Sequence, residues 1–191
     1  RQAVLDALPA LGQITSAHLD FSQLSSKYEA YLRGELPNIF NPKMATGSLM
    51  DLGVYCVYPA LDWFGFPRHI TAAADFLPTG ADGSCAAILE YPDKLVTLGC
   101  SKVGQSSLGS EILGDNGTLA IDSISQLARI QLYQNDGTSR SIAGSYEKNV
   151  LMSGEARDFL RYITCSGETR EEYAYASRLS LDVCRVMAEI R

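Results

Sequence analysis

Two side chains near the middle of the chain could move a proton together. Asp51 and Tyr55 stand four residues apart, which places them on one face of any helix that contains both. Carboxyl groups ordinarily titrate near about 4 and phenols near about 10, so a shuttle at neutral pH needs a nearby cation or mutual coupling. Lys43 and Lys102 are candidate cations, but only folding could bring them close. The pair is a candidate acid–base site.

The same spacing also allows a structural interpretation. Asp51 would lie in the first turn of its helix, where a carboxylate suits the positive helix end and accepts hydrogen bonds from free N–H groups. Tyr58 and Asp62 continue the stripe seven and eleven residues after Asp51. Spacing alone leaves both a capping role and a catalytic role for Asp51 open.

The helix that carries the pair is predicted over residues 47–65. It is apolar nearly all round, so we expect it to be buried. Gly65 and Pro67 supply its end, and Pro59 is expected to bend or break it near the middle. Its apolar residues are Leu49, Met50, Leu52, Val54, Val57, Leu61, Trp63 and Phe64.

The segments around this helix predict an α+β protein. A helix end over 1–11 and a strand over 13–21 precede an irregular segment, 22–46, expected to help choose a substrate. Short β-leaning runs separated by tight turns then indicate an open, largely antiparallel sheet with helices on one face. These runs are His69–Phe76, Ser84–Tyr91, Leu95–Lys102, Ser110–Gly114, Thr118–Asp122, Ala128–Gln134 and Ser139–Ile142.

Two helices are predicted to close the chain. The first is expected to begin at Ser153, with Phe159, Leu160, Tyr162 and Ile163 on its apolar side. The second begins at a predicted capping box, Thr169 to Glu172, and its inward face holds Tyr175, Leu179, Val183, Val186, Met187 and Ile190.

Several familiar catalytic machineries lack their sequence signatures. The chain has no phosphate-binding loop of the G-x-x-x-x-G-K-[ST] kind, no G-x-G-x-x-G fingerprint and no G-x-S-x-G elbow. Its two histidines, His18 and His69, lie in predicted strands without metal-ligand spacing, so we expect no metal site. The proton-moving pair is what remains.

Composition limits the partners and the location. The 191 residues carry a formal net charge of −6, which argues against a nucleic-acid partner. No uncharged stretch approaches the roughly twenty residues of a membrane-spanning helix, so no membrane is expected. The five cysteines are an odd number and widely scattered, which indicates small buried side chains and a cytoplasmic location. A start at Arg1 indicates a piece of a longer chain.

At this point the residues resemble a known family. Gly47 to Tyr55 is similar to the G-x-x-x-D-x-G-x-[HY] signature in the second domain of Gfo/Idh/MocA oxidoreductases. The resemblance extends in the right order over essentially the whole chain. The further matching segments are Gly12–Ile14, Asp62–Gly65 with Pro67, Thr79–Asp82 and Glu111–Leu119.

The resemblance implies an enzyme that passes hydride between NAD or NADP and a sugar-like small-molecule substrate. Asp51 falls on the position that orients substrate hydroxyls, and Tyr55 on that of the proton donor or acceptor. The tyrosine resembles the dihydrodiol dehydrogenase and glucose–fructose oxidoreductase branch more than inositol dehydrogenases with histidine. A first-domain lysine would supply the missing cation and lower the phenol's pKa.

The departures from the family pattern are equally specific. The cofactor-binding first domain and its lysine have no counterpart, and only Gly47 remains of a usual glycine pair. We therefore expect 1–191 to be one substrate-binding and oligomerisation domain, with 1–11 left from an interdomain helix. Alone it should bind no cofactor and be inactive, and it should pair with another copy through an apolar sheet face. The alternatives are a sugar-responsive regulator and an assembly domain, neither of them catalytic.

Overall fold

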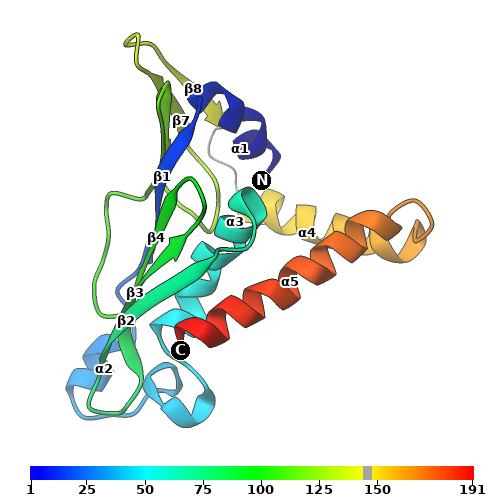
Figure 1. Ribbon diagram of the computed structural model, residues 1–191. Helices are drawn as coiled ribbons and strands as arrows, with labels where there is room; N and C mark the ends of the chain where they lie inside the picture. The colour runs from blue at the N-terminus through cyan, green and yellow to red at the C-terminus, as the bar shows by residue number, and fades with distance from the viewer. Residues whose placement is uncertain (144–147) are drawn as a thin grey trace.

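An eight-stranded sheet forms one layer of the protein, and helices cover one of its faces (Figure 1). The computed structural model describes residues 1–143 and 148–191. The predicted α+β class is confirmed. The strands are β1 (Ile14–Ser22), β2 (His69–Phe76), β3 (Asp82–Glu90), β4 (Leu95–Ser101), β5 (Ser110–Gly114), β6 (Gly117–Ile121), β7 (Ile130–Gln134) and β8 (Ser139–Ala143).

The helices include four short irregular turns. The α-helices are α1 (Gln2–Ala7), α2 (Tyr28–Leu32), α3 (Val54–Phe64), α4 (Lys148–Thr164) and α5 (Arg170–Ile190). Three 3₁₀ turns, η1 (Leu8–Leu11), η2 (Asn38–Phe40) and η3 (Pro42–Met44), and one π-helical turn, η4 (Leu49–Gly53), complete the set.

The strand order is β2-β3-β4-β1-β5-β6-β7-β8, with β1 parallel to β4 and every other described pair antiparallel. The strand from the start of the chain therefore lies between two meanders and joins them. Each predicted strand is present within two residues of its expected bounds, because β-favouring residues bounded by tight turns indicate both the strand and its ends.

The core lies between the sheet and the helices. Along β3 the side chains of Cys85, Ala87 and Leu89 are buried and their neighbours are more exposed, so every second residue faces the core. From the other layer, Val57 of α3 and Val186 of α5 are fully buried in the same cluster. Burying one face of the sheet fixes its register.

The other face of the sheet is uncovered and mostly small or polar. On β1 it presents His18 and Asp20, and on β3 it presents Ala86 and the exposed Ile88. The same face also presents the exposed apolar side chains of Leu95 on β4 and Tyr133 on β7, so it is mixed in character. Pairing with another copy through this face stays a prediction.

The cysteines divide into two groups. Cys56, Cys85 and Cys100 are buried, as predicted, and burial raises the pKa of the Cys56 thiol. Cys165 and Cys184 are exposed, so the prediction is wrong for them. Cys165 lies in the turn between α4 and α5, and Cys184 lies on the exposed side of α5.

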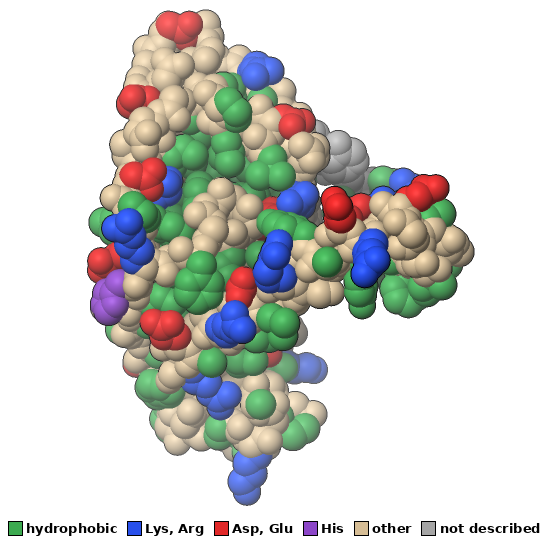
Figure 2. Space-filling model, turned by 45° about the vertical axis from the view of Figure 1, so that its right-hand side comes forward, with side chains coloured by type: hydrophobic (Ala, Val, Ile, Leu, Met, Phe, Trp, Pro, Cys, Tyr) green, Lys and Arg blue, Asp and Glu red, His purple; other side chains and the backbone are tan. Residues whose placement is uncertain are grey.

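Helices α4 and α5 form an arm beside the sheet (Figure 1). Only the C-terminal part of α5 reaches the core, through Val183, Val186 and Met187. Helix α4 already includes Lys148, so the predicted start at Ser153 is wrong. Its predicted apolar side is exposed at Phe159, Leu160 and Ile163, and Figure 2 shows hydrophobic side chains along the arm.

The predicted capping box at the start of α5 does not form. Thr169 is the N-cap residue, but its hydroxyl donates to the carbonyl of Cys165 rather than accepting from α5. Glu172 accepts hydrogen bonds from Arg161 and Tyr162 of α4. The Glu172 carboxylate thus links the two helices of the arm.

A distant carboxylate caps the helix that carries the candidate pair. The Ser48 hydroxyl and the Leu49 N–H both donate to the Asp82 carboxylate, each at 2.7 Å. A Cβ on Gly47 would lie 1.8 Å from Asp82 Oδ1, so only glycine lets this carboxylate approach. Gly47, the first residue of the Gly47–Tyr55 motif, therefore leaves the space that Asp82 needs to cap the helix.

We expect Asp82→Ala to lower the free energy of unfolding by about 1–2 kcal/mol, because the helix loses its cap and the buried Ser48 hydroxyl loses its acceptor. Chemical denaturation followed by circular dichroism measures this loss. Asp75→Ala, on the exposed edge strand β2, is the matched control and should change stability by less than about 0.5 kcal/mol. Equal losses in the two variants would contradict the capping role.

Helix α3 passes through Pro59 without a break, so of the two expected outcomes the break is wrong and the bend stays a prediction. Proline lacks an N–H, which leaves the carbonyl of Tyr55 without its helical donor. Tyr55 belongs to the half-exposed side of the helix, where water can bond that carbonyl. The irregular part lies earlier, in the π-helical turn η4. Among the described residues, no helix has both the length and the apolar character needed to span a membrane.

Candidate active site

A buried lysine holds Asp51. Lys102, directly after β4, is only 5% exposed, and its Nζ donates to Asp51 Oδ2 and, at 3.2 Å, to the carbonyl of Ile39. The same ammonium lies 5.9 Å from the ring centroid of Phe40. Folding therefore brings one of the two candidate cations, Lys102, to the carboxylate and ties both to the segment before α3.

The capping interpretation of Asp51 is wrong. The cap is Asp82, which bonds the N–H of Leu49, whereas the Asp51 carboxylate bonds Lys102. Its side chain keeps about a third of its surface exposed, at 33%. One side of the carboxylate is thus held by a buried cation while part of it can still meet a bound molecule.

Tyr55 lies at the junction of two cavities. It is 46% exposed, and its ring packs edge-on against Phe21 of β1 with centroids 5.1 Å apart. Tyr55 and Ile124 line both cavities. The expectation that the helix is buried all round is therefore wrong, because one side of α3 forms a cavity wall.

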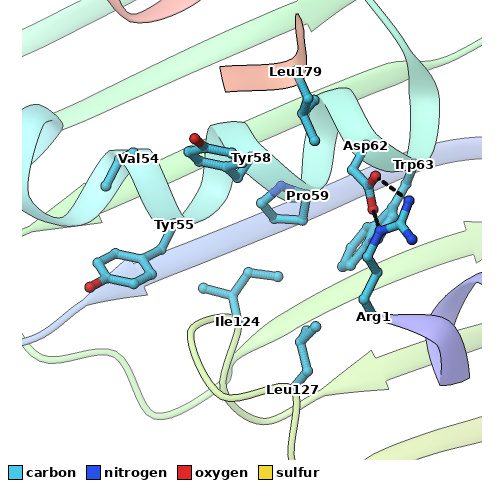
Figure 3. A pocket seen from close by; sticks show the side chains of 10 residues that line it. All are labelled: Arg1, Val54, Tyr55, Tyr58, Pro59, Asp62, Trp63, Ile124, Leu127 and Leu179. Carbon is cyan, nitrogen blue, oxygen red and sulfur yellow. Dashed lines mark hydrogen bonds and ion pairs between the residues drawn. The ribbon is translucent and has the colours of Figure 1, made fainter. Parts of the chain in front are cut away.

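The first cavity has a volume of about 450 Å³ and is largely apolar. Its wall includes Tyr58 and Asp62, which confirms that the predicted stripe shares one side of α3 from Tyr55 onward (Figure 3). The remaining lining residues are Arg1, Val54, Pro59, Trp63, Leu127 and Leu179, with Ile124.

The polar groups of this cavity are engaged in holding helices together. The Tyr58 hydroxyl donates to Ser180 at 2.7 Å. Asp62 accepts two hydrogen bonds of 2.8 Å from the Arg1 guanidinium and one from the hydroxyl of Tyr175. The Asp62 carboxylate raises the pKa of Arg1 by favouring its charged form. In Figure 3 Tyr55 lies at the opposite end of the cavity from this ion pair.

Asp51 lines neither cavity. No hydrogen bond joins it to Tyr55 among the residues that the structure describes. The reason is η4: a π-helical turn closes hydrogen bonds five residues apart, so the i, i+4 arithmetic of an α-helix does not carry across it. The sequence places the two residues one turn apart correctly but not their side chains in one cavity.

The second cavity was not foreseen from the sequence. It has a volume of about 630 Å³ and is lined mainly by serine and glutamine side chains. They come from the end of β1 and from the connections β4–β5 and β6–β7. The signal available was two Ser/Gln-rich turns, 105–109 and 122–126, but nothing in their spacing shows that they meet.

The residues present do not fit a complete dinucleotide site. Pyrophosphate is ordinarily held by a glycine-rich turn at a helix N-terminus. Here the N-terminus of the central helix is occupied by Asp82, and the Arg1 guanidinium beside Tyr58 is bound to Asp62. The described part of the chain also groups no three His, Cys, Asp or Glu side chains as metal ligands.

Residues 8–120, more than half of the chain, match the GFO/IDH/MocA C-terminal domain. The chain belongs to the GFO/IDH/MocA family. It is 34% identical over 184 residues to the scyllo-inositol 2-dehydrogenase (NADP(+)) IolU of Bacillus subtilis, covering 96% of this chain and 55% of that protein. It is 41% identical over 124 residues to the uncharacterized oxidoreductase YgjR of Escherichia coli, covering 65% and 38% respectively.

Solved structures of oxidoreductases share the fold. A mutant 3-ketoreductase from Actinomadura kijaniata, in complex with TDP-benzene and NADP, superposes with a TM-score of 0.73 at 17% identity, covering 100% of this chain and 56% of that chain. This chain spans about half the length, or less, of the curated relatives that it matches. Its predicted family is confirmed, and the branch within the family stays a prediction.

Proposed function

We propose that this chain is the substrate-binding part of an NAD(P)-dependent oxidoreductase that acts on a hydroxyl or carbonyl group of a sugar-like compound. The observation that carries the proposal is the position of Tyr55. Its phenol lies between an apolar and a polar cavity, one turn from a carboxylate held by a buried lysine. The relative named as an NADP(+)-dependent scyllo-inositol 2-dehydrogenase supports a polyol substrate.

The two residues have different roles in this proposal. Tyr55 Oη gives a proton to, or takes it from, the oxygen of the reacting carbon. Asp51 accepts a hydrogen bond from a substrate hydroxyl through the part of its carboxylate that Lys102 leaves exposed. A cofactor bound elsewhere in the parent protein would supply the hydride chemistry.

Cofactor-dependent turnover tests the proposal. The full-length parent should oxidise at least one member of a polyol and sugar panel, including scyllo-inositol, with a rise in absorbance at 340 nm in the presence of NAD⁺ or NADP⁺. The 191-residue chain alone should show no such rise, because its residues do not fit a dinucleotide site. A parent that binds a polyol but transfers no hydride would instead support a sugar-responsive regulator.

Two further properties complete the proposal. The parent works in the reducing cytoplasm, since the five cysteines of this chain are free thiols. It self-associates through the uncovered sheet face, because an antiparallel sheet with one face open can pack against a second copy.

A further inference from the structure

The polar cavity beside Tyr55 is built by three segments far apart in the sequence. The end of β1 contributes residues 20–23, the β4–β5 connection contributes 105–109, and the β6–β7 connection contributes 122–126. Its volume of about 630 Å³ lies within the range of about 300–1,000 Å³ typical of small-molecule sites. The cavity is therefore large enough for a ligand beyond the reacting carbon itself.

Hydroxyl and amide groups dominate its lining. Ser106, Ser107 and Ser125 supply hydroxyls, and Gln23 and Gln126 supply amides. Each of these groups can both donate and accept a hydrogen bond. A sugar or cyclitol hydroxyl also donates and accepts. The lining can therefore form hydrogen bonds with a polyhydroxylated ring or chain in more than one orientation.

The charged groups of the lining are all acidic. Among its described residues the lining includes the carboxylates of Asp20 and Asp122 and no lysine, arginine or histidine. Arg129, which lies outside the lining, donates to Asp122 at 2.8 Å, and Ser22 donates to Asp20 through both its N–H and its hydroxyl. A phosphate placed here would meet carboxylates and no cation of the lining.

Three backbone N–H groups of the cavity wall are already engaged within the protein. The N–H of Ser22 donates to Asp20, that of Ser106 to the carbonyl of Ser22, and that of Gln126 to the carbonyl of Ser123. These amides cannot turn together into the anion-binding concavity that phosphate sites use. The described lining therefore offers a phosphate no cation, and these three amides are already bound to other acceptors.

We propose that the polar cavity binds the hydroxyl-bearing body of an uncharged polyol or sugar and discriminates against phosphate esters and nucleotide-linked sugars. The inference rests on the proposed function for the placement of the reacting carbon at Tyr55. Discrimination follows because an anion would lose hydration, meet no cation of the lining to compensate for that loss, and be repelled by the carboxylates of Asp20 and Asp122.

A titration of the 191-residue chain followed by amide NMR tests the proposal without cofactor or turnover. The uncharged probes are D-glucose, scyllo-inositol and D-glucitol, and the charged probe is D-glucose 6-phosphate. At least one uncharged probe should shift amides of 20–23, 105–109 and 122–126, with an apparent affinity at least tenfold above that of the phosphate. The proposal is overturned if the phosphate binds equally well, or if no uncharged probe shifts these amides.

A charge variant tests the same proposal through a change in affinity for one probe, so the absolute affinities of the probes do not matter. Gln126→Lys adds a cation at an exposed position of the wall and should raise the affinity for glucose 6-phosphate by about two- to fivefold. Ser139→Lys adds the same charge on β8, outside the cavity, and should leave the order of probes unchanged. Equal gains in both variants would show attraction by net charge and overturn the assignment. Binding in this order without hydride transfer by the parent would instead contradict only the proposed function.

Discussion

Tyr55→Phe in the full-length parent is expected, under the proposed function, to lower kcat by about 10²- to 10⁴-fold, the usual contribution of a positioned general acid or base. The substitution removes only the phenolic oxygen. The ring keeps its edge-on contact with Phe21, and no hydrogen bond of the described structure involves the Tyr55 hydroxyl. Stability should therefore change by less than about 0.5 kcal/mol while turnover collapses.

Tyr58→Phe is the matched control for this prediction. Tyr58 lines the same apolar cavity from the same helix, but its hydroxyl donates to Ser180 of α5. Its loss should reduce stability by about 0.5–1.5 kcal/mol, the usual net value of one hydrogen bond, and change kcat only a fewfold. Steady-state kinetics and denaturation of both variants separate the two roles. Similar losses of kcat in the two tyrosine variants would remove Tyr55 from the chemistry.

The strands follow from the sequence because each one carries its own signals. The β-leaning runs His69–Phe76 and Ser110–Gly114, with turn residues at both ends, predict bounds that the structure reproduces. Such signals are local. They do not show that the first strand lies beside β4 and β5, since that pairing joins residues about eighty to a hundred positions apart.

The N-terminal end of the helix formed by η4 and α3 could not be predicted either, because it also depends on residues far apart in the sequence. Its cap is Asp82, 34 residues beyond Ser48, and local spacing offers Asp51 for that role. The π-helical turn then changes the angular spacing between Asp51 and Tyr55. The polar cavity likewise forms only where the end of β1 meets the β4–β5 and β6–β7 connections, so the sequence shows its composition but not its existence.

The exposed apolar side of α4 shows the limit of periodicity. Helical spacing correctly groups Phe159 and Ile163 on one side, but it cannot say what covers them. In the described structure these side chains are exposed, whereas the C-terminal part of α5 is buried. The same kind of pattern thus belongs to core in one helix and to surface in the other.

Lys102→Met is expected to lower the free energy of unfolding by about 1–3 kcal/mol, less than a fully buried pair would lose because Asp51 stays partly in water. The same change should reduce kcat/KM of the full-length enzyme by about 10- to 100-fold, since Asp51 loses the group that orients it. Lys43→Met is the control. Lys43 lies exposed in η3, and its replacement should alter neither quantity appreciably.

A double-mutant cycle decides whether Lys102 acts through Asp51. Asp51→Asn alone should reduce kcat/KM by a similar factor, because the neutral amide orients a substrate hydroxyl less strongly than a carboxylate does. Residues that work as one unit give non-additive losses, so adding Lys102→Met to Asp51→Asn should cost less than threefold more. If the two losses multiply, Lys102 supports the fold through Ile39 and Phe40 and not through the carboxylate. If Asp51→Asn leaves kcat/KM unchanged, Asp51 does not touch the substrate, and the assignment of the site reduces to Tyr55.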